Sequence, residues 1–340
     1  MFQTWPNLFL QSYASAPLTW FMLRVSDMGY ESFYAALLAI LIFGVSFKRG
    51  FLLLQLLLWS ALLNSVLKDF FSLPRPVHVD ANVLNNGTPS GAPFTSMGAS
   101  SFLGALPPAV VEHLRATIPS GSDEFGFPSG HVQSCTVLWG SSSLLWDSRV
   151  VRWLAPFVIV LMALSRLYLG RHFLADVLGG AALGGAVVLA FVFVQRAAWD
   201  ARLFTRAWTE FRAALPNVAV WILLIGAPLA IMPFYPGRAG AMLGTGAGFL
   251  MVMGGGLPDD AGTWAQRAAR VACALLFHIA TAGLVGMASG AARLNHGDWW
   301  VVAVASSVPS FVMMWGTVAA CTRAGLYRAR ITEAVPSGAQ

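Results

Sequence analysis

Two histidines, one aspartate and three basic residues occupy short polar blocks between long apolar runs. The blocks read Lys68-x6-Arg75-Pro76, Pro128-Ser129-Gly130-His131 and Ser165-Arg166-x5-His172-x3-Asp176. Arginine offers a planar fork that suits phosphate oxygens, and lysine offers a compact positive charge. An imidazole near neutral pH can attack or move a proton. This combination predicts phosphoryl transfer.

The anion-binding residues come from all three blocks. Lys68, Arg75 and Arg166 supply fixed positive charge, and Pro74 and Pro76 hold the segment around Arg75 extended. The Ser129 hydroxyl and the Gly130 backbone N–H add donors. If His131 begins a helix, these donors lie at its N-terminus, which favours an anion.

The proposed chemistry divides between the two histidines. His172 and Asp176 are four residues apart, so both lie on one face of a helix that begins near His172. A carboxylate on one ring nitrogen fixes the tautomer and leaves the other nitrogen free to attack. His131 then protonates the leaving oxygen. We expect no metal and no cofactor, because the three cations neutralise the phosphate.

Two apolar runs, 132–146 and 151–164, separate the second and third blocks. Each is close to the length that a membrane-crossing helix needs. Two crossings return the chain to the side that it left. We therefore expect His131 and His172 to face the same water layer.

Composition supports a membrane protein. Of the 340 residues 57% are hydrophobic and 11% are charged, whereas a soluble domain carries about 25% charged residues. We expect an all-α, polytopic transmembrane helical bundle with about nine spans. The expected spans are 31–47, 51–71, 131–146, 151–170, 175–195, 216–235, 239–257, 269–289 and 299–322.

Small residues recur at a spacing of four in two of these spans. Gly180 and Gly184 share one face of the fifth span, and Gly240, Gly244 and Gly248 share one face of the seventh. Such spacing lets helices approach closely in lipid. We expect these glycines to mark helix contacts rather than a ligand site.

The net charge of +6 comes almost wholly from arginine. The basic residues cluster between alternate spans, which fits the positive-inside bias better than a nucleic-acid partner. We expect an extracytoplasmic N-terminus, a cytoplasmic C-terminus and a site on the extracytoplasmic side, which is periplasmic in a bacterial inner membrane.

The chain divides by composition into five segments. These are an N-terminal extracytoplasmic or interfacial segment at 1–30, a catalytic membrane core at 31–195, a cytoplasmic linker at 196–215, an additional four-span region at 216–322 and a cytoplasmic tail at 323–340. The core contains a long outer loop at 72–130 that is rich in Gly, Pro and Ser.

The three blocks together resemble the signature of type 2 phosphatidic acid phosphatases. That superfamily also includes glucose-6-phosphatases, undecaprenyl-diphosphate phosphatases and vanadium haloperoxidases. The resemblance covers residues from about 30 to 195. It implies that His172 forms a phosphohistidine with Asp176 as its orienting partner, and that His131 is the acid. The phosphate-binding residues that it implies are Lys68, Arg75, Ser129, Gly130 and Arg166.

The resemblance implies a metal-independent membrane phosphatase that vanadate inhibits. The expected substrate is a lipid phosphate or diphosphate, such as undecaprenyl diphosphate or a phosphatidic acid. The nine-span layout is similar to that of glucose-6-phosphatase, which leaves a soluble sugar phosphate as an alternative substrate. The four extra spans leave open a transporter or scramblase of phosphate lipids without catalysis. The sequence does not indicate an oligomeric state.

Overall fold

The computed structural model describes residues 2–89, 98–99, 104, 106–117, 125–200, 218–295 and 297–331. Most of the expected linker at 196–215, the middle of the expected loop at 72–130 and the end of the expected tail at 323–340 lie outside these residues. The chain divides into two compact units. The first comprises Met1–Tyr34 and Trp59–Phe193, and the second comprises Ala35–Leu58 and Val194–Gln340.

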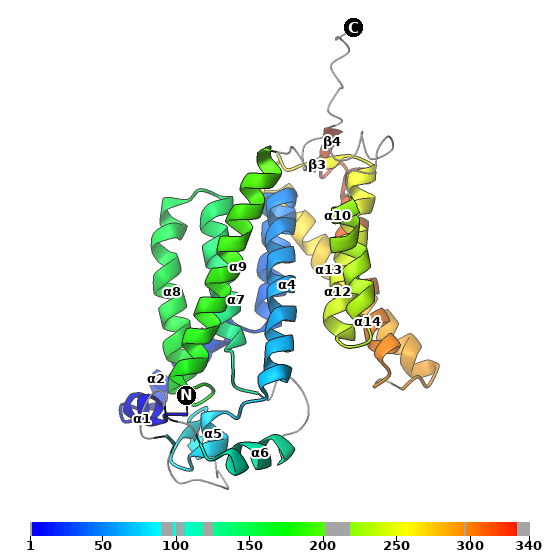
Figure 1. The fold of residues 1–340 in the computed structure, drawn as a ribbon. Coiled ribbons are helices and arrows are strands. Elements are labelled where there is room, and N and C mark those ends of the chain that lie inside the picture. Colours follow the sequence, from blue (N-terminus) through cyan, green and yellow to red (C-terminus); the bar gives the residue numbers. More distant parts are fainter. Residues whose placement is uncertain are drawn as a thin grey trace. The chain divides into compact units, whose positions relative to one another are not determined.

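The first unit is mostly helical (Figure 1). Three of its helices, α3, α4 and α9, also contribute residues to the second unit. Its elements are α1 (Trp5–Gln11), α2 (Ala16–Asp27), α3 (Glu31–Ala39), α4 (Phe47–Phe71), α5 (Pro76–Val79), β1 (Leu84–Asn85), β2 (Thr88–Pro89), α6 (Pro108–Thr117), α7 (Gly130–Leu145), α8 (Arg149–Tyr168) and α9 (Leu174–Asp200).

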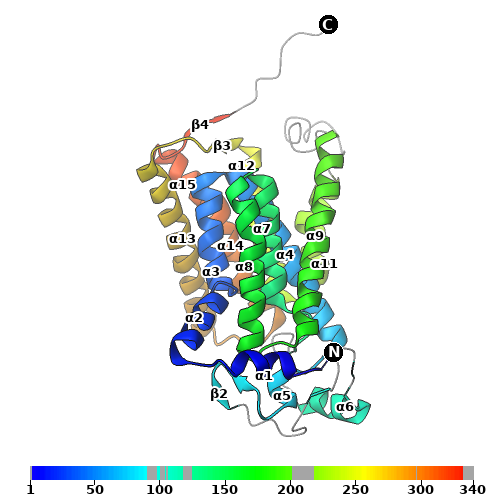
Figure 2. The same cartoon turned by 90° about the vertical axis from the view of Figure 1, so that its left-hand side faces the viewer.

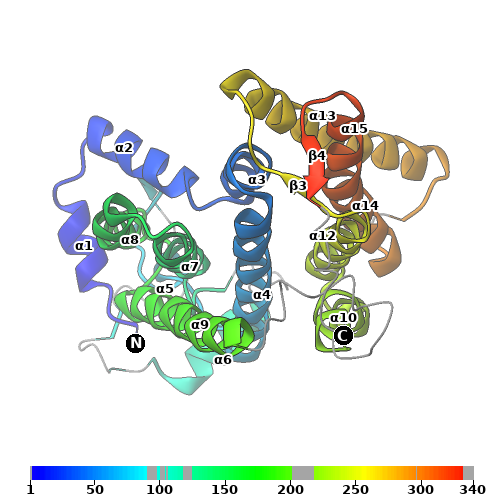
Figure 3. The ribbon, with the colours of Figure 1, turned by 90° about the horizontal axis from the view of Figure 1, so that it is seen from above.

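Helices α7, α8 and α9 run side by side, and α1 and α2 pack on α8 (Figures 2 and 3). Residues from all three long helices form one buried apolar cluster of Val132, Cys135, Met162, Leu167 and Val177. Between helices that face lipid, van der Waals packing of such side chains contributes the attraction.

The expected contact face at Gly180 and Gly184 is present. A Cβ added at Gly184 would lie 2.7 Å from the Cβ of Thr136, and one added at Gly180 would lie 2.5 Å from the carbonyl oxygen of Ser129. Helix α9 therefore approaches the start of α7 more closely than any larger residue allows, as the small-residue spacing predicts.

Local sequence signals set several element ends. The Ser148 hydroxyl accepts a hydrogen bond from the Val151 backbone N–H and caps α8. Strands β1 and β2 form a short antiparallel hairpin with Leu84 opposite Pro89. Its turn places Asn86 and Gly87 at positive φ, which these two residue types tolerate best.

The second unit adds three short π-helical segments to its α-helices. Its remaining elements are η1 (Ile40–Val45), α10 (Val218–Trp221), η2 (Ile222–Gly226), α11 (Ala227–Ile231), α12 (Pro236–Gly254), β3 (Leu257–Asp259), α13 (Trp264–Ala291), α14 (Trp299–Phe311), η3 (Val312–Gly316), α15 (Thr317–Arg323) and β4 (Arg328–Ile331). Strands β3 and β4 pair antiparallel, so two short antiparallel strand pairs accompany the expected all-α fold.

The glycines of α12 form its contact with α14. A Cβ added at Gly240 would lie 2.5 Å from the carbonyl oxygen of Ala303, and one added at Gly248 would lie 2.7 Å from the Cβ of Met314 in η3. An added Cβ at Gly244 would overlap the Ser307 carbonyl group. The spacing of four thus predicted the packing face correctly.

Five segments of the described chain are long and apolar enough to cross a membrane: Phe47–Val79, Arg149–Tyr168, Leu174–Phe193, Trp264–Ala291 and Trp299–Arg323. Helix α2 and the segment Glu31–Val45 pass the same test together, with a bend of 56° between them. The other expected spans correspond to α7, to α12 and to Val218–Ile231. The fold is a helical membrane architecture, and the count of nine spans stays a prediction.

Candidate active site

The first block lies where α4 ends. Lys68 is in the last turn of α4 and Arg75 immediately precedes α5, and both side chains are buried. The backbone of Arg75 is extended, with φ −92° and ψ 162°, as expected for a residue before proline. The Lys68 ammonium group donates a hydrogen bond of 2.9 Å to the Phe125 carbonyl oxygen. Lys68 therefore ties the first block to the segment that leads into the second.

The second block begins α7. Ser129 is the N-cap residue, and its backbone N–H donates to the Asp176 carbonyl oxygen at 2.9 Å. A Cβ at Gly130 would lie 3.0 Å from Oδ1 of Asn64. Within the described chain, neither the buried Ser129 Oγ nor the buried His131 Nε2 has a hydrogen-bond partner. These two atoms are free to bind an oxygen-rich ligand at the positive end of α7.

The third block begins at the end of α8. Arg166 is buried in the last turn of α8, and its NH1 donates to the Ser26 hydroxyl at 2.5 Å. Its Nε has no hydrogen-bond partner among residues that the structure describes. One edge of the guanidinium is therefore held by the protein, and a buried N–H on another edge is available to an anion.

His172 and Asp176 meet as the spacing predicts. The two side chains are buried, and His172 Nδ1 lies 3.4 Å from Asp176 Oδ2. The same carboxylate oxygen accepts a 2.9 Å hydrogen bond from the Phe173 backbone N–H, just before α9. Asp176 thus stabilises the helix start and faces the His172 ring with one oxygen. The Nε2 atom lies on the opposite side of the imidazole ring from this carboxylate.

Gly170 shapes the turn between α8 and His172. Its φ of +70° lies in the left-handed region, where a side chain is strained. An added Cβ would also overlap the Leu84 carbonyl oxygen and approach Val83 to 2.8 Å. The glycine therefore allows the chain to turn in close contact with Leu84 of β1, and this turn places His172 in the site.

Groups from all three blocks affect the pKa of His172. Burial lowers the pKa of His172 well below its ordinary value, and the positive charges of Arg166, Arg75 and Lys68 lower it further, as does His131. The His172 imidazole is therefore neutral at neutral pH, which is the form that can attack.

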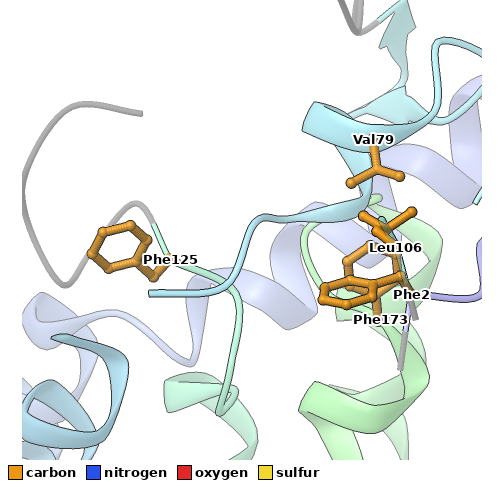
Figure 4. Close-up of a cluster of buried hydrophobic side chains, with 5 residues drawn as sticks. All are labelled: Phe2, Val79, Leu106, Phe125 and Phe173. Atoms are coloured by element: carbon orange, nitrogen blue, oxygen red, sulfur yellow. The ribbon is translucent and has the colours of Figure 1, made fainter. Parts of the chain in front are cut away.

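An apolar cluster joins the segments that carry the blocks. Phe2, Val79, Leu106, Phe125 and Phe173 belong to one cluster of buried residues. In Figure 4, Phe2, Leu106 and Phe173 lie against one another with Val79 beside them, and Phe125 lies to one side. The rings of Phe2 and Phe173 meet edge to face with their centroids 5.5 Å apart. Phe173 follows His172 directly, Phe125 precedes the second block and Val79 ends α5. This cluster fixes the loops by burial rather than by polar contacts.

The sequence reasoning missed the contribution of α1. Asn7 is fully buried, and its Nδ2 donates to the carbonyl oxygens of Leu167 at 2.8 Å and His172 at 3.0 Å. One turn later, Gln11 Nε2 donates to Tyr168 and Leu84 carbonyl oxygens at 2.8 and 2.9 Å. Two amides at i and i+4 in an otherwise apolar helix were the available signal.

A second missed group lies inside the bundle, where Asn64 and Gln133 connect α4 to α7. Asn64 Nδ2 donates to Gln133 Oε1 at 2.6 Å, and Gln133 Nε2 donates to both oxygens of Ser60 at 2.8 Å. Asn64 also reaches the Pro128 carbonyl oxygen at 3.3 Å. Polar residues within membrane spans are energetically costly and are usually functional. Asn64 and Gln133 in two expected spans were therefore a signal of a polar contact between these helices.

Metal binding is a separate question. In the ranges that the structure describes, no group of three or more His, Cys, Asp or Glu side chains is arranged to hold a metal ion. The expectation of metal-independent chemistry stays a prediction. Inhibition by a chelator tests it.

The fold and the site define a class: a helical integral membrane protein with a buried, strongly cationic site that contains two histidines. Residues 49–200 match the PAP2 superfamily. The two relatives described below carry phosphatase names, which supports a phosphate-ester hydrolase. Residues 49–200 thus match the superfamily that the three blocks predicted.

Two curated relatives are similar to this chain. Lipid A 4'-phosphatase from Porphyromonas gingivalis is 24% identical over 156 residues, which are 45% of this chain and 54% of that protein. Phosphatidylglycerophosphatase B from Bacillus subtilis is 29% identical over 167 residues, which are 48% of this chain and 68% of that protein. The chain thus spans about half of the first relative and two thirds of the second. No solved structure is significantly similar to the chain.

Proposed function

We propose that this protein is a membrane phosphatase that hydrolyses a lipid phosphate or diphosphate through a phosphohistidine at His172. One observation carries the proposal: three buried cations, two histidines and one aspartate from distant parts of the sequence surround the same region. Hydrogen bonds between the segments support this convergence: Lys68 donates to the Phe125 carbonyl oxygen at 2.9 Å, and the Ser129 backbone N–H donates to the Asp176 carbonyl oxygen at 2.9 Å. A site that only bound phosphate would not require the neutral imidazole or its Asp176 partner.

In the proposed first step, His172 Nε2 attacks phosphorus and the bond to the leaving oxygen breaks. Asp176 faces Nδ1 at 3.4 Å and stabilises the charge that develops on the ring. His131 donates a proton to the leaving oxygen. Lys68, Arg75 and Arg166 bind the non-bridging oxygens, together with the Ser129 hydroxyl and the Gly130 N–H, where negative charge accumulates.

In the second step, water attacks the phosphohistidine. His131, now neutral, accepts a proton from this water, and the bond between nitrogen and phosphorus breaks. Inorganic phosphate leaves, and His172 returns to its neutral form. The cycle consumes one water molecule and requires no redox partner.

A lipid substrate fits the surroundings of the site. The site lies at the ends of α7, α8 and α9, and both α8 and the Leu174–Phe193 part of α9 are long and apolar enough to cross a bilayer, so a lipid tail can stay in the membrane while its headgroup reaches His172. The names of the two relatives also refer to phosphorylated lipids. We propose an undecaprenyl diphosphate or a phosphatidic acid type of substrate.

The arrangement of arginines supports an extracytoplasmic site. The basic residues outside the three blocks cluster between alternate expected spans and in the C-terminal tail. With those segments in the cytoplasm, the end of the bundle that carries His131 and His172 faces the other side. Labelling of cysteines introduced near residue 82 and near residue 325 in intact cells tests this orientation.

A substrate panel tests the function. The full-length protein in detergent is incubated with prenyl diphosphate, phosphatidic acid and sugar phosphate, and released phosphate is measured with and without vanadate or EDTA. We expect release from a lipid substrate, inhibition by vanadate, no effect of EDTA and no turnover by the His172→Ala variant. Turnover by that variant would show that His172 is not the nucleophile.

The panel also separates the alternatives. A preference for sugar phosphate would indicate the glucose-6-phosphatase-like alternative. No phosphate release from any substrate, with lipid movement across liposomes that persists in His172→Ala, would indicate a transporter or scramblase.

A further inference from the structure

Three residues in the last turn of α2 and in the turn that follows it contact the site from outside the family-matched segment 49–200. Ser26 is buried in the last turn of α2, and its hydroxyl accepts the hydrogen bond from Arg166 NH1. Tyr30 packs its ring edge to face with the His131 imidazole, with centroids 4.8 Å apart and an interplanar angle of 84°. The N-terminal segment therefore contacts both Arg166, a proposed phosphate-binding residue, and His131, the proposed acid.

Tyr30 also connects these two groups. Its side chain lies close enough to the Arg166 guanidinium to interact with it electrostatically. Arg166 is thus held from one direction by Ser26 and from another by Tyr30, while its Nε has no partner within the described chain. Since a guanidinium is planar, two fixed contacts determine the direction in which its remaining N–H groups point.

Gly29 makes the contact with His131 possible. A Cβ added at Gly29 would overlap the His131 ring, at 2.7 Å from Cγ and 3.1 Å from Cβ. Any other residue would displace either the turn or the imidazole. The turn and the ring thus fit together only with glycine here.

The two contacts differ in exposure. Ser26 and Arg166 are nearly inaccessible, at 1% and 3%, whereas Tyr30 is 49% exposed. A buried hydrogen bond from a charged group is among the stronger ones. A half-exposed aromatic ring against His131 limits the rotation of the imidazole from the outer side.

We propose that Ser26, Gly29 and Tyr30 are positioning residues for the phosphatase reaction: Ser26 and the Tyr30 hydroxyl orient Arg166 toward the phosphate oxygens, and Gly29 and the Tyr30 ring orient His131 toward the leaving oxygen. This inference rests on the proposed function. It assigns a role in the reaction to a segment that precedes the three sequence blocks.

The two halves of the proposal have different kinetic signatures. An acid matters most for a poor leaving group, so disturbance of His131 slows an alkyl phosphate more than an aryl phosphate. Disturbance of Arg166 weakens phosphate binding and affects both substrates alike. Tyr30→Phe keeps the ring and removes the hydroxyl, whereas Tyr30→Ala removes both.

The experiment compares variants of the full-length protein in detergent on an alkyl and an aryl phosphate, with vanadate binding as a second measurement. We expect Ser26→Ala and Tyr30→Phe to reduce kcat/KM about tenfold on both substrates and to weaken vanadate binding. We expect Tyr30→Ala to lose about tenfold more on the alkyl than on the aryl phosphate. Gly29→Ala should behave like Tyr30→Ala.

Tyr13→Phe and Gly185→Ala serve as matched controls, because Tyr13 is exposed and a Cβ at Gly185 meets no atom within 4 Å. Thermal melting shows whether each variant is folded. Unchanged kcat/KM and vanadate binding in folded Ser26→Ala and Tyr30→Phe would overturn the inference, while wild-type turnover that depends on His172 would leave the proposed function intact. An equal loss on both substrates in Tyr30→Ala would show that Gly29 and the Tyr30 ring do not orient His131.

Discussion

At the scale of single residues, the site depends on a histidine that the protein keeps neutral. Burial and the neighbouring cations lower the pKa of His172, and Asp176 faces its Nδ1 at 3.4 Å. The carboxylate is also fixed by the Phe173 N–H. Since one oxygen of Asp176 serves both contacts, orientation of the ring and the start of α9 are coupled.

Replacement of Asp176 by Asn tests this coupling. The amide keeps the shape of the side chain but cannot stabilise positive charge on the His172 ring, and it changes the favoured tautomer. We expect kcat to fall by about 10²–10⁴-fold with a smaller change in KM. Steady-state phosphate release gives both constants. Activity close to that of wild type would show that His172 does not need this partner.

The low pKa of His172 predicts the pH dependence of stability. An unfolded histidine takes up a proton as the pH falls through about 6.5, whereas folded His172 stays neutral there. The unfolded chain then binds more protons, so the free energy of unfolding decreases as the pH falls below that value. Melting temperatures at pH 7.5 and 5.5 should differ less in His172→Asn than in wild type. An equal decrease in both proteins would contradict this assignment.

At the scale of elements, short helix α1 holds the loop that carries His172. Asn7 donates to carbonyl groups on both sides of the turn at Gly170, and Gln11 donates to the neighbouring Tyr168. These buried carbonyl groups follow the end of α8 or lie in its last turn. The α1 side chains therefore add donors to carbonyl groups around this helix end, where the Leu167 carbonyl also accepts from the Gly170 N–H at 3.0 Å.

Replacement of Asn7 by Ala leaves the Leu167 and His172 carbonyl oxygens without this donor. We expect a loss of about 1–3 kcal/mol in the free energy of unfolding and a lower kcat from a less ordered His172 loop. Denaturant melts and phosphate release measure the two effects. Ser12→Ala, an exposed change at the end of the same helix, should alter neither.

The contact of α9 with α7 offers a matched pair of adjacent glycines. A Cβ at Gly184 would press on Thr136 and on the Gln133 carbonyl group, whereas a Cβ at Gly185 meets nothing within 4 Å. We expect Gly184→Ala to destabilise the protein by about 1–3 kcal/mol. Gly185→Ala should be neutral or stabilising by up to about 1 kcal/mol, because alanine favours helix. Equal melting temperatures for the two variants would show that the helices separate easily.

At the scale of the whole molecule, the sequence-predicted site residues all lie in the first unit. The second unit has a polar centre of its own at Arg270, which is 1% exposed. Its guanidinium donates to the carbonyl oxygens of Asp260, Ala261 and Leu326 and lies 4.1 Å from the centroid of the Tyr327 ring. One side chain thus joins the segments next to β3 and β4.

Replacement of Arg270 by Lys tests this centre. Lysine keeps the charge but cannot reach three carbonyl groups with one planar fork. We expect a loss of about 2–3 kcal/mol from the second unit, seen as faster proteolysis of the segment around residues 260 and 326. Arg323→Lys, at an exposed helix end, is the control. Resistance to proteolysis equal to wild type would show that the carbonyl contacts add little.

The sequence alone predicted much of the local structure of the candidate site. Residue types and spacing predicted the pairing of His172 with Asp176, the helix that starts at the second block and the glycine faces of α9 and α12. These features depend on neighbours within a few residues or on the helical period. Two consecutive apolar runs also sufficed to predict that both histidines lie at the same end of the bundle.

Only the tertiary structure decided which residues surround that chemistry. Asn7, Ser26 and Tyr30 reach groups that are 101 to 165 residues away in the sequence, and Arg270 reaches Leu326 in the same way. No periodicity specifies such contacts, because they depend on how separate helices pack and on which buried carbonyl or guanidinium group then needs a partner. A lone Asn or Ser has many possible partners until the fold selects one.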